Sequence, residues 1–274
     1  MKYETLHGVS LPKIGFGTWR IAGEAAPDPA LESASRSALR SALELGYTHF
    51  DTAEYYAGGF AEKLLGETIK EAGIERKNLF ITTKVSPSHL HLNDVLQSCE
   101  NSLKRLGMNY IDLYLIHWPN PRIPLEETFG ALNQLVREGR VKHLGVSNFN
   151  LRTLQKAFAL SETPLLTNQV PYSLPEKTYV KNGVLEYCQQ NDIVLTAYSP
   201  VKWRNLKVNK TIQSIARVHN ITVFQVALAW LINQPRVITI PMSLDPAHQA
   251  ENLAAANVEL DASEMEILTG LYKR

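Results

Sequence analysis

The sequence predicts an α/β protein, a (β/α)8 (TIM) barrel preceded by an N-terminal β-hairpin. Short apolar or β-branched runs alternate with amphipathic segments along the 274 residues. The apolar runs contain few polar residues, which is typical of strands buried on both faces of a parallel sheet. Eight strand–helix units are the number that closes such a barrel, although a doubly wound open sheet also alternates strand and helix.

The strands and helices follow from these two patterns in chain order. The predicted strands are Ile14–Gly17, His49–Asp51, Leu79–Val85, Tyr110–Trp118, Val141–Val146, Leu166–Val170, Ile193–Ala197 and Val237–Ile240. Helices are predicted where apolar residues recur three and four apart. They include Ala30–Leu45, Phe60–Ala72, Leu92–Leu106, Leu125–Glu138, Leu151–Ala159, Gly183–Gln190 and Ile212–Val218.

Turn and cap residues agree with these boundaries. Pro124 precedes a predicted first helical turn that is rich in acidic residues. Gly107 and Gly139 each follow the charged last turn of a predicted helix and are predicted to be its C-cap. The opening stretch Tyr3–Lys13 contains a turn glycine and predicts a short hairpin before the first barrel strand. The stretch Val201–Asn209 is polar and irregular, which predicts a loop. Because no linker or shift in composition divides the chain, residues 1–274 are predicted to form a single domain.

Composition excludes several classes of function. The formal net charge of +1 gives no electrostatic footprint for nucleic acid or an anionic membrane. No apolar run approaches the length of a membrane span, and the N-terminus has no signal-peptide core. The two cysteines, Cys99 and Cys188, are far apart in helical patterns and predict reduced core thiols, so a cytoplasmic protein is the expectation. His89 and His91 have no partner at metal-ligand spacing, and no metal site is predicted.

Polar residues gather where the predicted strands end. Asp51 ends the second strand, Lys84 lies near the end of the third, and His117 lies near the end of the fourth. The later strands end near Ser147, Asn148, Gln169, Tyr198, Ser199 and Ser243. A parallel barrel brings its C-terminal strand ends to one rim, where barrel enzymes keep their active sites. A single strand-end Asp–Lys pair or histidine is commonly structural, but this many polar ends in one barrel indicate a site.

The motifs resemble those of the aldo-keto reductase family from about Gly15 to Leu253. They are GFGTW, FDTAEYY, TTKV, LIHWP, GVSNFN, NQVPYS, AYSP, IPMS and AENL. The family pattern Asp-Thr-Ala-x-x-Tyr selects Tyr56 over Tyr55. The resemblance implies an NAD(P)H-dependent oxidoreductase that reduces aldehyde and ketone carbonyls to alcohols. It also implies that Asp51, Tyr56, Lys84 and His117 form the catalytic set.

The same resemblance implies a binding site for the nicotinamide cofactor along the rim. Ser147, Asn148 and Gln169 would hold the carboxamide, and Tyr198 would stack on the ring. The remaining implied cofactor contacts are Gly17, Thr18, Trp19, Asp51, Ser199, Pro200, Val201, Ile240, Pro241, Met242, Ser243, His248, Glu251 and Asn252. Trp19, Tyr56, His117 and Trp118 are expected to contact the substrate, and Trp203 is placed there only by its loop position.

Carbonyl reduction explains why these residue types occur together. Hydride delivered to the carbonyl carbon leaves negative charge on the oxygen, which needs a proton donor. A tyrosine with a pKa of about 10 is a weak acid at neutral pH. An adjacent Lys84 ammonium is expected to lower that pKa, and Asp51 would keep the ammonium charged. Tyr56 is therefore the predicted general acid, with His117 orienting the substrate oxygen.

The sequence departs from the family at the end that would bind adenosine. Members that use NADPH usually carry a lysine and an arginine where this chain has Met242 and His248, and Asp245 lies between the two. A 2′-phosphate carries about −1.5 to −2 charge and needs cations. Use of NADH, alone or alongside NADPH, is therefore predicted. Asp245 before Pro246 also has the signature of a helix N-cap, and a helix N-terminus can itself bind phosphate.

Substrate identity and rival functions remain open at the level of sequence. The segments expected to wall the pocket, Pro119–Ile123 and Val201–Asn209, are short and predict an open site for varied small carbonyl compounds. The resemblance also implies a monomer. One rival is a non-catalytic or redox-sensing nicotinamide-nucleotide-binding module on the same fold. Another is an unrelated barrel enzyme that uses Lys84 as a Schiff-base amine, although a lysine held by a carboxylate is a poor nucleophile.

Overall fold

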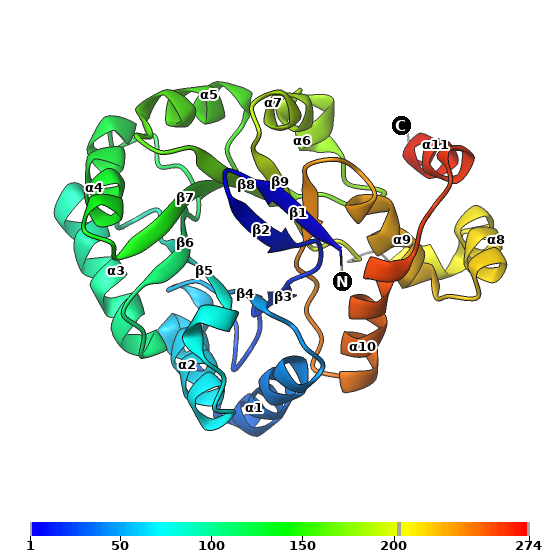
Figure 1. Cartoon of the computed structure of the whole chain (residues 1–274), viewed down its shortest axis with the longest axis horizontal. Coiled ribbons are helices and arrows are strands. Elements are labelled where there is room, and N and C mark those ends of the chain that lie inside the picture. Colours follow the sequence, from blue (N-terminus) through cyan, green and yellow to red (C-terminus); the bar gives the residue numbers. More distant parts are fainter. Residues whose placement is uncertain (1, 202–203, 273–274) are drawn as a thin grey trace.

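The computed structural model describes residues 2–201 and 204–272, and its main feature is one curled sheet of eight parallel strands surrounded by helices (Figure 1). Neighbouring strands follow the order β10-β9-β8-β7-β6-β5-β4-β3. Their bounds are β3 (Phe16–Gly17), β4 (His49–Asp51), β5 (Phe80–Val85), β6 (Ile111–Ile116), β7 (Val141–Ser147), β8 (Leu165–Pro171), β9 (Val194–Tyr198) and β10 (Val237–Thr239). The predicted (β/α)8 barrel is confirmed.

The barrel closes where its first and last strands meet. Ile14 forms a parallel bridge with Thr239, and the Gly15 N–H donates to the Thr239 carbonyl at 2.8 Å. The Gly17 N–H donates to the Pro241 carbonyl at 3.1 Å. A Cβ on Gly17 would stand 2.7 Å from the Ile240 carbonyl oxygen, so only glycine allows this approach of the two backbones.

The helices lie outside the sheet. They are α1 (Pro29–Glu44), α2 (Phe60–Glu71), α3 (Leu92–Leu106), α4 (Leu125–Arg137), α5 (Leu151–Leu160), α6 (Thr178–Lys181), α7 (Val184–Gln190), α8 (Lys210–His219), α9 (Val223–Ile232), α10 (Pro246–Ala254) and α11 (Ala262–Gly270). Short 3₁₀ helices are η1 (Tyr56–Gly59), η2 (Arg76–Asn78), η3 (Arg204–Val208) and η4 (Ala255–Asn257). The predicted loop at 201–209 therefore contains one 3₁₀ helix.

The predicted hairpin is confirmed and covers one end of the barrel. Strands β1 (Tyr3–Leu6) and β2 (Val9–Pro12) pair antiparallel across a turn in which His7 and Gly8 both have positive φ. Figure 1 shows the hairpin lying across the barrel opening. Its Leu6 and Leu11 pack against side chains from five barrel strands: Leu113, Leu115, Leu166, Val194, Ile238 and, at the margin, Phe80. The hairpin thus excludes water from the N-terminal end of the barrel.

Local residues set the ends of these helices, as the sequence predicted at Gly107, whereas the cap at Asp28 was not predicted. Asp28 caps α1 by accepting from the Ala30 N–H, and Gly107 ends α3 in the left-handed conformation. Helix α9 was not among the predicted helices. Eight of its ten residues are buried, so it has no polar face to produce a helical periodicity in the sequence.

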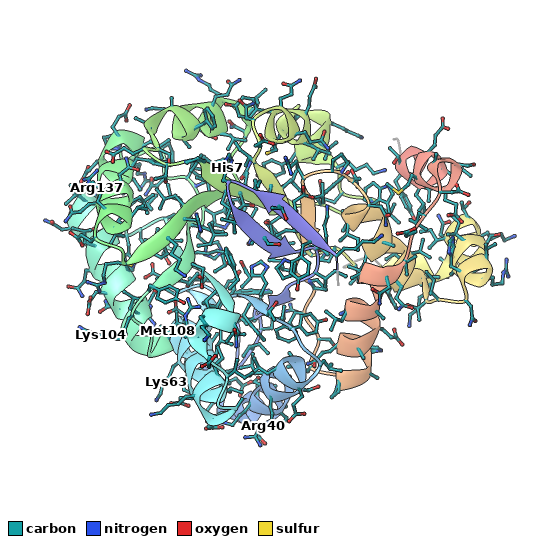
Figure 2. The ribbon with its side chains drawn as sticks, viewed as in Figure 1. His7, Arg40, Lys63, Lys104, Met108 and Arg137 are labelled. Carbon is teal, nitrogen blue, oxygen red and sulfur yellow. The ribbon has the colours of Figure 1, made fainter. Side chains whose placement is uncertain are left out.

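Several charged side chains project outward from the helical ring and form ion pairs with neighbours. Figure 2 shows Arg40, Lys63, Lys104 and Arg137 around its edge. They lie within 4 Å of the acidic residues Glu71, Glu67, Glu100 and Glu162 respectively.

Cys99 and Cys188 are buried free thiols. Across residues 2–201 and 204–272, no single helix is long and apolar enough to cross a membrane; α8 and α9 meet that test only as a pair bent by 86°.

Candidate active site

Asp51, Lys84 and Tyr56 form a hydrogen-bonded group at the C-terminal end of the barrel. Asp51 is the last residue of β4, Lys84 is the penultimate residue of β5, and Tyr56 begins the 3₁₀ helix η1. The Lys84 Nζ lies 2.5 Å from Asp51 Oδ1 and 3.2 Å from the Tyr56 hydroxyl. It also donates to the Thr52 carbonyl at 2.8 Å, so all three ammonium protons have acceptors.

Burial governs the protonation of this group. The Lys84 side chain is 0% exposed. Burial pushes the pKa of Lys84 down, but Asp51 and Tyr56 favour the ammonium and raise the pKa above its ordinary value. Burial raises the pKa of Tyr56 above its ordinary value, and the opposing effect of Lys84 is smaller. The expected net lowering of the Tyr56 pKa is therefore wrong, because loss of hydration outweighs the neighbouring cation.

His117 lies beside Tyr56 and is neutral. It directly follows β6, and its ring centroid is 5.6 Å from that of Tyr56, at an interplanar angle of 75°. Burial, and secondarily the charge on Lys84, lower the pKa of His117 to about 3. The imidazole can therefore donate or accept a hydrogen bond at neutral pH but carries no charge. This fits an orienting role better than a share in proton transfer.

Aromatic side chains cluster around Tyr56. Trp19 contacts the Tyr56 ring edge-to-face at 5.0 Å between centroids and stacks on Tyr55 at 6.3 Å. Tyr55 also contacts the His117 ring. Tyr55 was given no role from the sequence, since only its neighbour matches the family pattern. Trp118 is 46% exposed, and no ring contact to it occurs among the residues described; Trp203 lies outside them.

Ser147, Asn148 and Gln169 form a second polar group next to Asp51. The Gln169 Nε2 donates to Asp51 Oδ2 at 2.8 Å, and the Ser147 hydroxyl donates to the Gln169 carbonyl at 2.8 Å. The Asn148 Nδ2 donates to the His117 carbonyl at 3.0 Å. The Tyr198 hydroxyl donates to Asn148 Oδ1 at 2.9 Å. The predicted carboxamide residues and the predicted stacking residue are thus one network.

A further tyrosine and a threonine extend this group. Tyr179 donates to the Asn148 carbonyl at 3.3 Å, a contact that the sequence did not predict because Tyr179 lies in the short helix α6. The Thr18 N–H donates to the Asp51 carbonyl at 2.9 Å. The Thr18 hydroxyl is buried and has no hydrogen-bond partner in the described part of the chain. The amide and hydroxyl groups of this network, the ring of Tyr198 and the Thr18 hydroxyl are chemical groups that could contact a nicotinamide ring and its carboxamide.

The other predicted cofactor residues lie in two loops. Ser199 follows β9 with φ of 52°, Pro200 is buried, and Val201 packs against the core. After β10, Ile240 and Pro241 are buried, and Met242 and Ser243 are half-buried. Asn252 in α10 is also buried. These positions lie beside β3 and β9 at the same barrel end as Tyr198.

The start of α10 carries a negative charge. Asp245 is its N-cap, and its Oδ1 accepts from the Ala247 N–H at 2.8 Å, as the sequence suggested. His248 is exposed and lies 3.6 Å from Asp245 Oδ2. Met242, which stands where NADPH users of the family usually carry a lysine, is apolar. A phosphate approaching this helix would meet a carboxylate in place of the usual cations.

Glu251 lies apart from Ser243 and His248. It borders a pocket of about 750 Å3 between α8, α9 and α10, together with Gln213, Arg217 and Thr222. Its backbone carbonyl accepts from the Gln225 side chain at 3.0 Å. Ser243 and His248 do not line this pocket. The structure therefore divides the residues predicted near adenosine between two places.

Known proteins share this sequence and architecture. The profile of the Aldo/keto reductase family matches residues 13–273. The methylglyoxal reductase YeaE of Escherichia coli (strain K12) is 39% identical over 96% of this chain and 92% of its own length. A thermostable aldo-keto reductase in complex with the inhibitor epalrestat is 43% identical, with a TM-score of 0.94 over 99% of this chain and 100% of that one.

A further solved relative was captured with a cofactor. An aldo-keto reductase from Klebsiella pneumoniae in complex with NADPH is 34% identical, with a TM-score of 0.88 over 99% of this chain and 96% of that one. Likeness in sequence and in structure thus extends over nearly the whole length of both partners. From the barrel, the strand-end residues and these comparisons, we conclude that the chain belongs to the aldo/keto reductase family.

Proposed function

We propose that the protein is a single-domain, NAD(P)H-dependent carbonyl reductase in which Tyr56 is the general acid. The contact of the Tyr56 hydroxyl with the buried Lys84 ammonium, at 3.2 Å, carries the proposal. This contact lies at the barrel rim, beside the polar group of Ser147, Asn148 and Gln169 and next to the rings of Trp19 and His117. We also propose that the protein acts as a monomer, as the family resemblance implies.

The side chains divide the work of carbonyl reduction between them. A bound nicotinamide would supply the hydride to the carbonyl carbon. Tyr56 then donates its hydroxyl proton to the carbonyl oxygen, and the Lys84 ammonium stabilises the phenolate that remains. Asp51 keeps Lys84 protonated and in place. Neutral His117 donates a hydrogen bond that orients the carbonyl oxygen, and in alcohol oxidation Tyr56 acts as the base.

The nicotinamide would be held by the network around Asn148. Ser147, Asn148 and Gln169 supply the hydroxyl and amide groups that pair with a carboxamide, and all three are buried. Tyr198 offers its ring face and is fixed by its hydroxyl bond to Asn148. Because Gln169 also binds Asp51, cofactor position and the catalytic carboxylate are linked by one side chain.

We further propose that the enzyme uses NADH, alone or together with NADPH. Met242 and His248 stand where NADPH users of the family carry cations, and Asp245 caps the helix between them. Each charge-assisted hydrogen bond to a phosphate contributes about 1.5–3 kcal/mol. The NADPH complex of the Klebsiella pneumoniae relative supports a nicotinamide cofactor but not this preference.

The exposed aromatic side chains next to Tyr56 support small carbonyl compounds as substrates. Trp19 is 37% exposed and Tyr55 48% exposed, so neither ring is covered by a loop of the kind that would enclose a large ligand. The name of the relative YeaE, a methylglyoxal reductase, points to the same substrate class. A protonated Lys84 is a poor nucleophile, which argues against Schiff-base chemistry.

The test is oxidation of NADH and NADPH at 340 nm against small aldehydes and dicarbonyl compounds. We expect Tyr56→Phe to lose about 10²–10⁴-fold in kcat while cofactor binding, followed by fluorescence, is retained. Tyr114→Phe is the matched control, because Tyr114 is buried in β6 and its hydroxyl has no partner among the described residues. Near-normal turnover by Tyr56→Phe would exclude the assigned acid. Cofactor binding without any turnover by the wild type would favour the non-catalytic module.

The cofactor preference is measured in the same assay. We expect kcat/KM with NADH to equal or exceed one hundredth of that with NADPH. Met242→Lys combined with His248→Arg should restore the missing cations and improve NADPH binding by about 10-fold or more per cation, with little change for NADH. A hundredfold or greater preference of the wild type for NADPH would exclude the proposed use of NADH.

A further inference from the structure

The loop that carries Tyr56 has an unusual backbone. Ala57, Gly58 and Gly59 are three consecutive residues with positive φ, at 48°, 60° and 87°. Ala57 is not a glycine and is fully buried, so its left-handed conformation is disfavoured unless its surroundings impose it. On one side the Ala57 N–H donates to the Glu24 carbonyl at 2.6 Å. Something must also hold the other side of this loop.

Arg105 of α3 occupies that other side. Its Cδ and Nε lie 2.7 Å from the place where a Cβ on Gly59 would stand, so the side chain lies directly against the loop backbone. The Arg105 Nε donates to Glu62 Oε2 at 2.6 Å, and its Nη2 donates to the Ser102 hydroxyl at 3.1 Å. These bonds fix the guanidinium over Gly59.

Glu62 connects this contact to the strand that carries Lys84. The Glu62 side chain is 0% exposed and lies in the first turn of α2, directly after the loop. Its second oxygen, Oε1, accepts from the Thr83 hydroxyl at 2.5 Å. Thr83 immediately precedes Lys84 in β5, and alternation along the strand turns the two side chains to opposite faces. One carboxylate thus joins the strand of Lys84 to the loop of Tyr56.

We propose that Glu62 and Arg105 are positioning residues that set the distance between the Tyr56 hydroxyl and the Lys84 ammonium. Neither residue is hydrogen-bonded to Tyr56, Lys84, Asp51 or His117, so their effect is indirect. This inference rests on the proposed function of Tyr56 as the general acid. Because small misplacements of a catalytic group reduce turnover strongly, about 10²-fold for 1 Å, loosening this connection should reduce kcat.

The test compares Glu62→Gln with a matched control. Glu62→Gln keeps the side-chain size but removes the negative charge that faces Arg105, and it replaces one of the two accepting oxygens with an NH2 group that cannot accept a hydrogen bond. Asp112→Asn is the control, because Asp112 is also a buried carboxylate bound by two cations, Arg76 and Lys142, but on β6 near the N-terminal end of the barrel. Both variants lose stability, whereas only Glu62→Gln should affect the geometry of the site.

We expect kcat of Glu62→Gln to fall by about 10- to 100-fold while KM for the cofactor changes less than about twofold. The high-pH limb of the kcat profile, which reports loss of the Tyr56 proton, should shift in the same variant because the Lys84 ammonium no longer contacts the hydroxyl. In its crystal structure the separation of the Lys84 and Tyr56 side-chain heteroatoms should exceed hydrogen-bonding range, about 3.5 Å. Asp112→Asn should match the wild type in all three respects.

The crystal structure tests the positioning role even if the wild type reduces no carbonyl compound, so the two proposals fail separately. A Glu62→Gln structure with the wild-type separation, or an equal fall in kcat for Asp112→Asn, would overturn the inference. If Glu62→Gln does not fold, Arg105→Met is measured in its place, since this side chain is 28% exposed and methionine retains an apolar stem over Gly59. Wild-type kcat and pH profile in Arg105→Met would then refute the positioning role.

Discussion

The buried pair of Asp51 and Lys84 gives a quantitative prediction about stability. The two side chains are 2% and 0% exposed and lie 2.5 Å apart. In Asp51→Asn the ammonium keeps only neutral acceptors, the Thr52 carbonyl and the Tyr56 hydroxyl. Breaking a buried pair by removing one partner costs about 3–5 kcal/mol, because a buried charge is left uncompensated.

The converse single variant leaves the opposite charge. In Lys84→Met, Asp51 keeps only the Gln169 amide as a donor within the described residues, and a loss of similar size is expected. The double variant Asp51→Asn/Lys84→Met buries no charge. Its free energy of unfolding should therefore exceed the value expected from adding the two single losses by about 2–3 kcal/mol.

The measurement is a double-mutant cycle by urea denaturation at neutral pH without cofactor. Coincident fluorescence and circular dichroism transitions would establish that a single free energy describes each variant. Losses that add within about 0.5 kcal/mol would refute the reasoning, because they would show that the pair is not electrostatically coupled. All three variants should also lose carbonyl reduction, since each removes a part of the Tyr56 environment.

Three further predictions concern titration and packing. His117, with a pKa of about 3, should give no inflection in kcat between pH 5 and 8; one that disappears in His117→Phe would show that the imidazole is charged there. Burial lowers the pKa of His49 to about 4, so the unfolded chain binds a proton between about pH 6.5 and 4 that the folded state does not. As the pH falls through that window, the free energy of unfolding should therefore fall. The fall should be about 3 kcal/mol larger in the wild type than in His49→Gln, as measured by denaturation at each pH. Gly66→Ala should destabilise by about 1–3 kcal/mol, because its Cβ would meet the Leu106 carbonyl at 2.2 Å; Gly130→Ala, with open space around it, should stabilise α4 by about 0.5–1 kcal/mol, and similar melting temperatures for the two would contradict this.

The sequence predicted best those features that arise from repeating local patterns. Strand-end positions such as Asp51 and Lys84 were identified because parallel strands in a barrel must end at one rim. Helix α9 was missed because a helix that is buried on nearly all sides has no amphipathic period. Its Trp230, fully buried, reads in sequence like any apolar run.

Other features depend on which distant residues meet and had no local signal. Tyr55 contacts Trp19 and His117 only because the barrel brings three loops together. The direction of the Tyr56 pKa shift was wrong because the sequence reveals the nearby Lys84 but not the depth of burial. The buried Glu62, likewise, has the sequence signature of an ordinary acidic residue in a first helical turn.

The hairpin β1–β2 determines how the molecule could be attached to a support. It covers the barrel end opposite the rim that holds Tyr56, and the N-terminal end of the chain leads directly into its first strand (Figure 1). A tether or fusion partner joined before β1 would therefore leave the candidate site facing free solution, where small molecules can reach it. Anchoring through a side chain near the rim, such as His248, would turn the same entrance toward the support.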